Sequence, residues 1–80
     1  MTLRKMSAAG DEPVRDGNGL VCEWDATTSQ ERIAEIEKEF NELTKAGYWA
    51  ADITAGKEPT IIHKFDAKAD ILLGPKLQGG

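Results

Sequence analysis

The feature that most constrains this fold is one strongly amphipathic stretch near the middle of the chain. Four large apolar side chains recur there at spacings of three, four and three residues, which places them on one face of an α-helix. Thr28 and Glu31 match a capping box, and Gly47 suits the position just after a helix. The pattern predicts a helix over about residues 28–46 with one face to bury. The four apolar residues are Ile33, Ile36, Phe40 and Leu43.

Four shorter segments read as strands because they combine apolar side chains with a period of two. In the segment 48–53, Trp49, Ala51 and Ile53 are expected to face the core. Residues 2–7 are either an edge strand or disordered, and both alternatives stay open. The four segments are residues 20–24, 48–53, 60–65 and 70–73. The sheet beneath the helix is expected to contribute Trp24, Trp49, Ile53, Ile61 and Leu72.

The supply of large apolar side chains limits the chain to one small domain. Of its sixteen Leu, Ile, Val and Phe residues, fourteen lie between Leu20 and Leu77. One layer of helix on sheet uses nearly all of them, which leaves little to line a substrate pocket. We therefore expect a protein that is not an enzyme. The expected division is a weakly ordered arm or edge strand at residues 1–19, a domain at 20–75 and a flexible tail at 76–80.

Charge and hydropathy argue against two classes of partner. The formal net charge is −4, which disfavours nucleic acid and acidic membranes. No apolar run approaches the length of a membrane span, and no signal-peptide pattern opens the sequence. We expect a cytoplasmic protein that binds neither nucleic acid nor membrane.

The residues most often used in catalysis or metal binding are scarce. Cys22 is the single cysteine, so a Cys-based metal cage is excluded and a buried, unreactive thiol is expected. His63 is the single histidine and is expected to be structural. Residues 16–19 begin like a calcium loop but lack its later ligands and closing glutamate, so a turn is favoured. No metal site and no bound cofactor are predicted.

The end of the sequence is the most suggestive stretch for function. Gly74 and Pro75 terminate an apolar run, and the sequence closes on Gly79 and Gly80. Paired glycines carry no side chains, so they can thread a narrow enzyme channel and present a carboxylate. A terminal glycine pair arises by chance in about one chain in two hundred. The pair is therefore informative only together with the strand before it.

The order of elements, followed by Pro-x-x-x-Gly-Gly, resembles the β-grasp of ubiquitin and of the small sulfur carriers of the molybdopterin and thiamine pathways. The resemblance is topological over most of the chain and sequence-specific only over residues 70–80. It implies a two-layer α+β fold with one long helix on a mixed sheet of roughly four or five strands. Leu77 and Gln78 replace the basic tail of ubiquitin itself. The composition also suggests the ubiquitin-like proteins of bacterial operons that encode an activating enzyme and a metal-dependent deconjugating protease.

This resemblance implies a mechanism in which other proteins do the chemistry. An activating enzyme, using ATP and magnesium, would adenylate the Gly80 carboxylate. The acyl group would pass through a thioester to a target lysine, or would receive sulfur as a thiocarboxylate. A conjugating enzyme and a deconjugating protease are further expected partners. The implied reactive residues are Gly79 and Gly80, and the implied recognition residues are Pro75, Lys76, Leu77 and Gln78.

Three functions stay open at this point. We favour a protein modifier over a sulfur carrier, because the helix is extended and the match to the carriers is poor outside the tail. The third alternative is a small, non-catalytic interaction domain in which the glycine pair is incidental.

Overall fold

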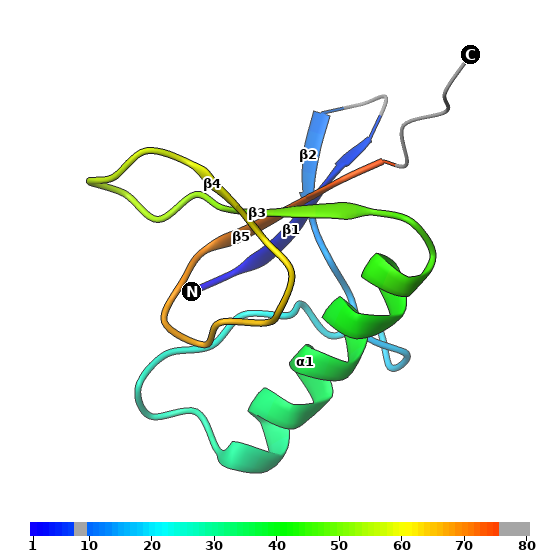
Figure 1. Cartoon of the computed structure of the whole chain (residues 1–80). Helices are drawn as coiled ribbons and strands as arrows, with labels where there is room; N and C mark the ends of the chain where they lie inside the picture. The colour runs from blue at the N-terminus through cyan, green and yellow to red at the C-terminus, as the bar shows by residue number, and fades with distance from the viewer. Residues whose placement is uncertain (8–9, 76–80) are drawn as a thin grey trace.

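The computed structural model describes residues 1–7 and 10–75. One helix lies on one face of a five-stranded sheet (Figure 1). The predicted α+β class, with a helix packed on a mixed sheet, is confirmed. The elements are β1 (Leu3–Ser7), β2 (Gly10–Pro13), α1 (Gln30–Lys45), β3 (Trp49–Asp52), β4 (Thr60–Ile62) and β5 (Ile71–Gly74).

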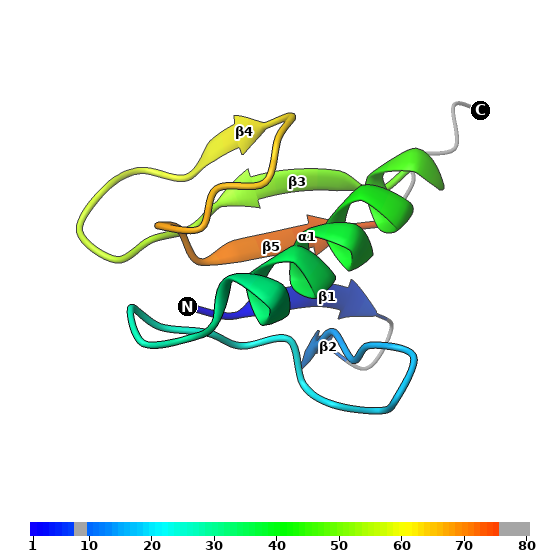
Figure 2. The same cartoon turned by 90° about the horizontal axis from the view of Figure 1, so that it is seen from below.

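The strands are arranged in the order β2-β1-β5-β3-β4. β1 and β5 are parallel, and every other neighbouring pair is antiparallel. Figure 2 shows α1 running across the face of this sheet, close to its central strands. This order and the single crossing helix make the fold β-grasp-like. No helix in the described part of the chain is long and apolar enough to cross a membrane.

The N-terminal hairpin differs from the sequence expectation. β1 is an interior strand between β2 and β5, not an edge strand, and β2 itself was not expected. The sequence of Gly10–Pro13 has the composition of a turn. It can still form an edge strand because pairing with β1 requires only the backbone groups of β2, while Asp11 and Glu12 stay exposed and Pro13 is half-buried.

The strand predicted at residues 20–24 is wrong. This segment makes only isolated bridges, from Val21 to Arg15 and from Glu23 to Thr2. Its alternation still serves the core, because Cys22 and Trp24 are buried while the residues between and beside them are not. The period of two therefore reflects the burial of alternate side chains against the core, although the segment does not join the sheet.

The helix begins at a different cap from the one the sequence indicated. Ser29 is the N-cap, and its hydroxyl accepts a hydrogen bond from the Arg32 N–H at 3.2 Å. Thr28 instead accepts a hydrogen bond from the Asp25 N–H at 2.9 Å. The capping box from Thr28 to Glu31 is therefore wrong by one position, because two adjacent hydroxyl residues compete for the same role.

The end of the helix follows the sequence. Gly47 has a φ of 111°, the left-handed conformation that favours glycine. Its N–H donates to Thr44 O and the Tyr48 N–H donates to Leu43 O, both at 3.1 Å, which is the Schellman pattern. Leu43 and Tyr48 are each packed against the core. The chain is thereby turned sharply from α1 into β3.

The core lies between α1 and the sheet. Ile36 and Phe40 are fully buried, with Ile33 and Leu43 half-buried beside them, so the predicted helix face is confirmed. The Phe65 ring lies 5.3 Å from Trp24 and 5.8 Å from Phe40 between ring centroids. The other buried members of the core cluster are Leu3, Val14, Cys22, Trp24, Ala50, Ala69, Ile71 and Leu73.

The predicted inward face of β3 is wrong by one residue. Ala50 lies in the core opposite Leu73 of β5, whereas Trp49 and Ala51 occupy the other face of the sheet. Ile61 and Leu72 are registered with Ala51 on that second face. A shift of one residue exchanges the two faces of a strand. Because Trp49 is large and apolar, the sequence indicated that its face, and not the face of Ala50, was the buried one.

Candidate functional site

The candidate site is the end of the sheet at which β5 delivers the chain to Pro75. β5 is held from both sides, because Leu73 is registered with Lys5 of β1 and with Ala50 of β3. Pro75 follows directly and is exposed. In Figure 1 the end of β5 lies at the same end of the molecule as the last turn of α1. Any segment that follows Pro75 therefore starts from a strand fixed in the middle of the sheet.

The last residue of β5 is covered by an aromatic ring. Gly74 is buried and registered with Trp49 of β3. A Cβ atom on Gly74 would lie 1.9 Å from both Cε2 and Cζ2 of Trp49. The indole thus fills the place of a side chain at this position, as aromatic residues do across strands from glycine. Only glycine lets β5 run straight beneath the ring to Pro75.

A shallow groove of about 470 Å³ lies beside Pro75. Met6 supplies apolar surface and is 40% exposed. Lys5 and Glu12 are opposite each other in the register of β1 and β2, so the wall carries both signs of charge. An exposed Met with charged residues at its rim is a composition found at protein–protein interfaces. The groove is lined by Lys5, Met6, Ser7, Glu12, Tyr48 and Pro75.

Local structure explains how these side chains meet. Ser7 Oγ donates to Gly10 O at 2.9 Å, which links the end of β1 to the start of β2. Tyr48 is brought in by the Schellman end of α1, one residue before β3. The groove therefore combines a hairpin, a helix end and the exit of β5, three segments that are distant in sequence.

Of the residues predicted to act at this end, only Pro75 can be placed. It lines the groove, and its role in recognition stays a prediction. Lys76, Leu77, Gln78, Gly79 and Gly80 lie outside the described residues. Sequence reasoning missed Trp49 as a neighbour of Gly74, although a glycine at the end of a strand, just before a proline, marks a place where another group approaches closely.

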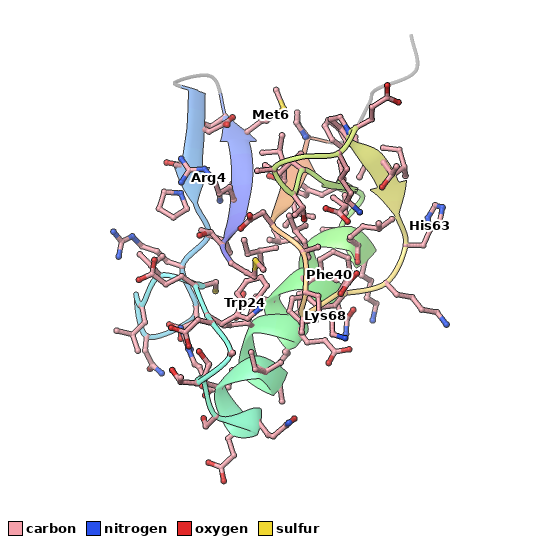
Figure 3. All side chains as sticks on the ribbon, turned by 90° about the vertical axis from the view of Figure 1, so that its left-hand side faces the viewer. Arg4, Met6, Trp24, Phe40, His63 and Lys68 are labelled. Atoms are coloured by element: carbon pink, nitrogen blue, oxygen red, sulfur yellow. The ribbon has the colours of Figure 1, made fainter. Side chains whose placement is uncertain are left out.

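The single cysteine and the single histidine, Cys22 and His63, lie outside the groove. Cys22 is fully buried, and burial raises the pKa of its thiol, so it is held in the unreactive thiol form. His63 points outward beside β4, whereas Trp24 and Phe40 lie toward α1 (Figure 3). Among residues 1–7 and 10–75, no group of three His, Cys, Asp or Glu side chains could hold a metal ion.

Asp16 holds the long loop before α1 and does not form a calcium loop. Its carboxylate is 2.6 Å from the Arg32 guanidinium and accepts the N–H groups of Asn18 and Leu20. Arg32 also donates to Val21 O at 3.1 Å. The hydrogen bond from Arg32, followed by the one from Leu20, lowers the pKa of Asp16. The loop is therefore fastened to the helix by one charged pair.

Asp52 organises the other end of β3. It is buried, and its carboxylate lies 2.5 Å from Lys57 Nζ and accepts both the N–H and the hydroxyl of Thr54. The Lys57 hydrogen bond, then those from Thr54, lowers the pKa of Asp52 to about 2. Thr54 Oγ1 accepts the Asp70 N–H in turn. This network ties the β3–β4 connection to the start of β5, away from the groove.

Comparison with known proteins adds no family to this picture. No protein-family model, no curated protein and no solved structure matches the chain.

Proposed function

We propose that this chain is a ubiquitin-like protein modifier whose C-terminal glycine is adenylated by an activating enzyme and joined to target lysines. The observation that carries the proposal is the central position of β5, held between β1 and β3 and leading directly to Pro75 beside a groove. A modifier needs a rigid body, a reactive segment that leaves it at a defined place, and a surface by which enzymes recognise that place. The β-grasp-like fold supplies the first, and the groove supports the third.

The chemistry itself would belong to the activating enzyme. The Gly80 carboxylate would attack the α-phosphate of ATP, displacing pyrophosphate, with magnesium held by that enzyme. An enzyme thiolate would then displace AMP, and a target amine would displace the thiolate to form the isopeptide bond. Activation depends on placing a carboxylate in line with a phosphate. The modifier therefore contributes position, not catalysis.

Positioning in this proposal starts at Gly74. Trp49 fixes the path of β5 up to that residue, and Pro75 restricts the backbone where the tail begins. The five residues that follow span at most about 17 Å. Restricting the root of such a short segment lowers the entropy lost when it enters an enzyme channel. This is the role we propose for Pro75, with Lys76, Leu77 and Gln78 as recognition residues.

The test is intact-mass analysis of the protein after expression with its neighbouring genes. A modifier gives conjugates joined through Gly80, whereas a sulfur carrier gives a thiocarboxylate, which is heavier because sulfur replaces oxygen. Deletion of Gly80 and Gly79→Val should each abolish the product and leave melting unchanged. Gly17→Val is the matched control, because a Cβ at Gly17 meets nothing within 4 Å. Full cellular function without Gly79 and Gly80 would favour the interaction-domain alternative.

A further inference from the structure

We propose that two copies of this chain associate through β4, pairing antiparallel about a two-fold axis at Ile61. The two five-stranded sheets would then continue into one, with both α1 helices on the same side. The partner surface is thus a second copy of the same strand. This inference does not depend on the function of the tail.

The backbone of β4 offers an open edge at its central residue. The Ile53 N–H donates to Asp70 O at 2.8 Å, which continues the ladder between β3 and β5. Hydrogen-bonded pairs alternate along an antiparallel ladder, so Ala51 bonds to β5 while Ala50 and Asp52 turn toward β4. Their partners on β4 are Ile62 and Thr60.

The N–H and C=O of Ile61 therefore point away from β3, toward the outside of the sheet. One donor and one acceptor on the same residue are self-complementary. Two Ile61 residues facing each other across a two-fold axis can exchange both hydrogen bonds, as a hydrogen-bonded antiparallel pair does.

The side chain of Ile61 also lacks cover. It is 61% exposed, although it is a large apolar residue. The register places it beside Ala51 and Leu72, on the sheet face opposite α1. In the proposed pair, the two Ile61 side chains lie next to each other on that face. Each would remove apolar surface of the other from water.

The charges that flank β4 specify a second copy over other strands. Glu58 precedes Ile61 by three residues and Lys64 follows it by three, and both are exposed. Antiparallel pairing about Ile61 places Glu58 of each copy near Lys64 of the other, just beyond each end of the short ladder, which gives two pairs of opposite charges. Within residues 1–7 and 10–75, neither side chain takes part in an ion pair, whereas nearby Lys57 is bound to Asp52.

The local sequence also limits the assembly to two copies. Pro59 has no N–H to donate, and the chain bends at His63, so the ladder is short. Pairing of β4 with β4 uses the same patch on both copies and is therefore closed. The opposite edge, β2, carries Asp11 and Glu12 and repels a second acidic edge. An interface this small predicts weak association that depends on the protein concentration.

Sedimentation equilibrium of the full chain, from about 10 μM to about 1 mM, tests the proposal. Glu58→Lys and Lys64→Glu should each weaken self-association at least tenfold, because like charges then face each other. An equimolar mixture of the two variants should associate as the parent does, and the double variant should recover self-association. Monomeric parent protein at the highest concentration, or failure of the mixture to associate, would overturn the proposal.

Two controls separate pairing from general charge effects. Glu37→Lys makes the same change in net charge on the exposed side of α1, and it should leave association unchanged. Lys38→Glu serves in the same way for Lys64→Glu. Glu58→Lys also brings the net charge closer to zero, which by itself favours association. Weakening by this variant is therefore opposite to what a nonspecific charge effect predicts, and an equal loss in Glu37→Lys would refute the pairing.

Discussion

The indole of Trp49 occupies the space that a side chain at Gly74 would need. We expect Gly74→Ala to destabilise the fold by about 1–3 kcal/mol, because the ring or the strand must move to admit one methyl group. Urea unfolding measures this loss. Gly17→Ala is the control, since a Cβ there meets no atom within 4 Å.

A double-variant cycle identifies the contact. Once Trp49→Ala has removed the ring, Gly74→Ala should cost much less than in the parent, because the two residues are in contact and their effects do not add. Additive losses of stability would mean that Gly74 is sensitive for a reason other than Trp49.

The parts of the fold that the sequence predicted are those set by local pattern. The helix face around Ile36 and Phe40, and the end of the helix at Gly47, depend on spacings within a few residues. β2 was missed because its pairing uses backbone groups that any sequence possesses. The phase of β3 was missed because Ala50, beneath the helix, is smaller than Trp49 on the other face. Which residue faces the core is decided by packing with distant strands.

The sequence likewise predicted only the part of the candidate site that a local pattern indicates. Pro75 was found because proline interrupts a strand wherever it occurs. The groove was not found, because Lys5 and Glu12 meet through the pairing of β1 with β2, and Pro75 and Tyr48 join them only through the parallel pairing of β1 with β5 and the turn after α1. No spacing in the sequence records either contact.

Phe40→Ala should be the most damaging single change in the helix. Phe40 is fully buried and its ring contacts Phe65. Removing it should cost about 3–5 kcal/mol, through lost burial and the cavity left behind. Thermal and urea unfolding give the value. Leu20→Ala is the comparison, because Leu20 is also a large apolar residue but is 58% exposed. Equal losses at the two positions would contradict the core described above.

The Asp52–Lys57 pair predicts how stability varies with pH. The pKa of Asp52 is lowered from 3.8 to about 2. Its contribution is therefore fully present above pH 3.8 and declines as the pH falls toward 2. The urea midpoint of the parent should exceed that of Asp52→Asn at neutral pH, and the difference should shrink across this window. A difference in urea midpoint that stays constant from about pH 5 to about pH 2 would show that Asp52 is not held ionised.

The Asp16–Arg32 pair predicts order in a segment whose composition indicates mobility. Residues 8–19 are rich in turn formers and poor in apolar side chains, which predicts rapid amide exchange. In the structure the Val14 N–H donates to Leu3 O, and the N–H of Leu20, the residue just after this segment, donates to the Asp16 carboxylate. We expect both amides to be protected from hydrogen exchange. Arg32→Ala should raise the exchange rate at Leu20 far more than at Val14. Rapid exchange at both amides in the parent would instead support the mobility that the composition indicates.

The groove beside Pro75 predicts a separation of binding from chemistry in the proposed activation reaction. Met6→Glu places a charge on the apolar part of its lining without touching the buried core. With the cognate activating enzyme, pyrophosphate exchange should show a higher KM for the variant and an unchanged kcat. A group that helps binding equally in the ground and transition states affects KM alone. Deletion of Gly80, by contrast, should remove the reaction altogether.

Leu20→Glu is the matched control for Met6→Glu, because it introduces the same charge at another exposed apolar residue, outside the groove. Its KM should equal that of the parent. If both variants raise KM alike, the enzyme responds to net charge and not to the groove. If neither changes KM while deletion of Gly80 still abolishes exchange, the tail is the reactive element and the enzyme recognises the body of the protein at another surface.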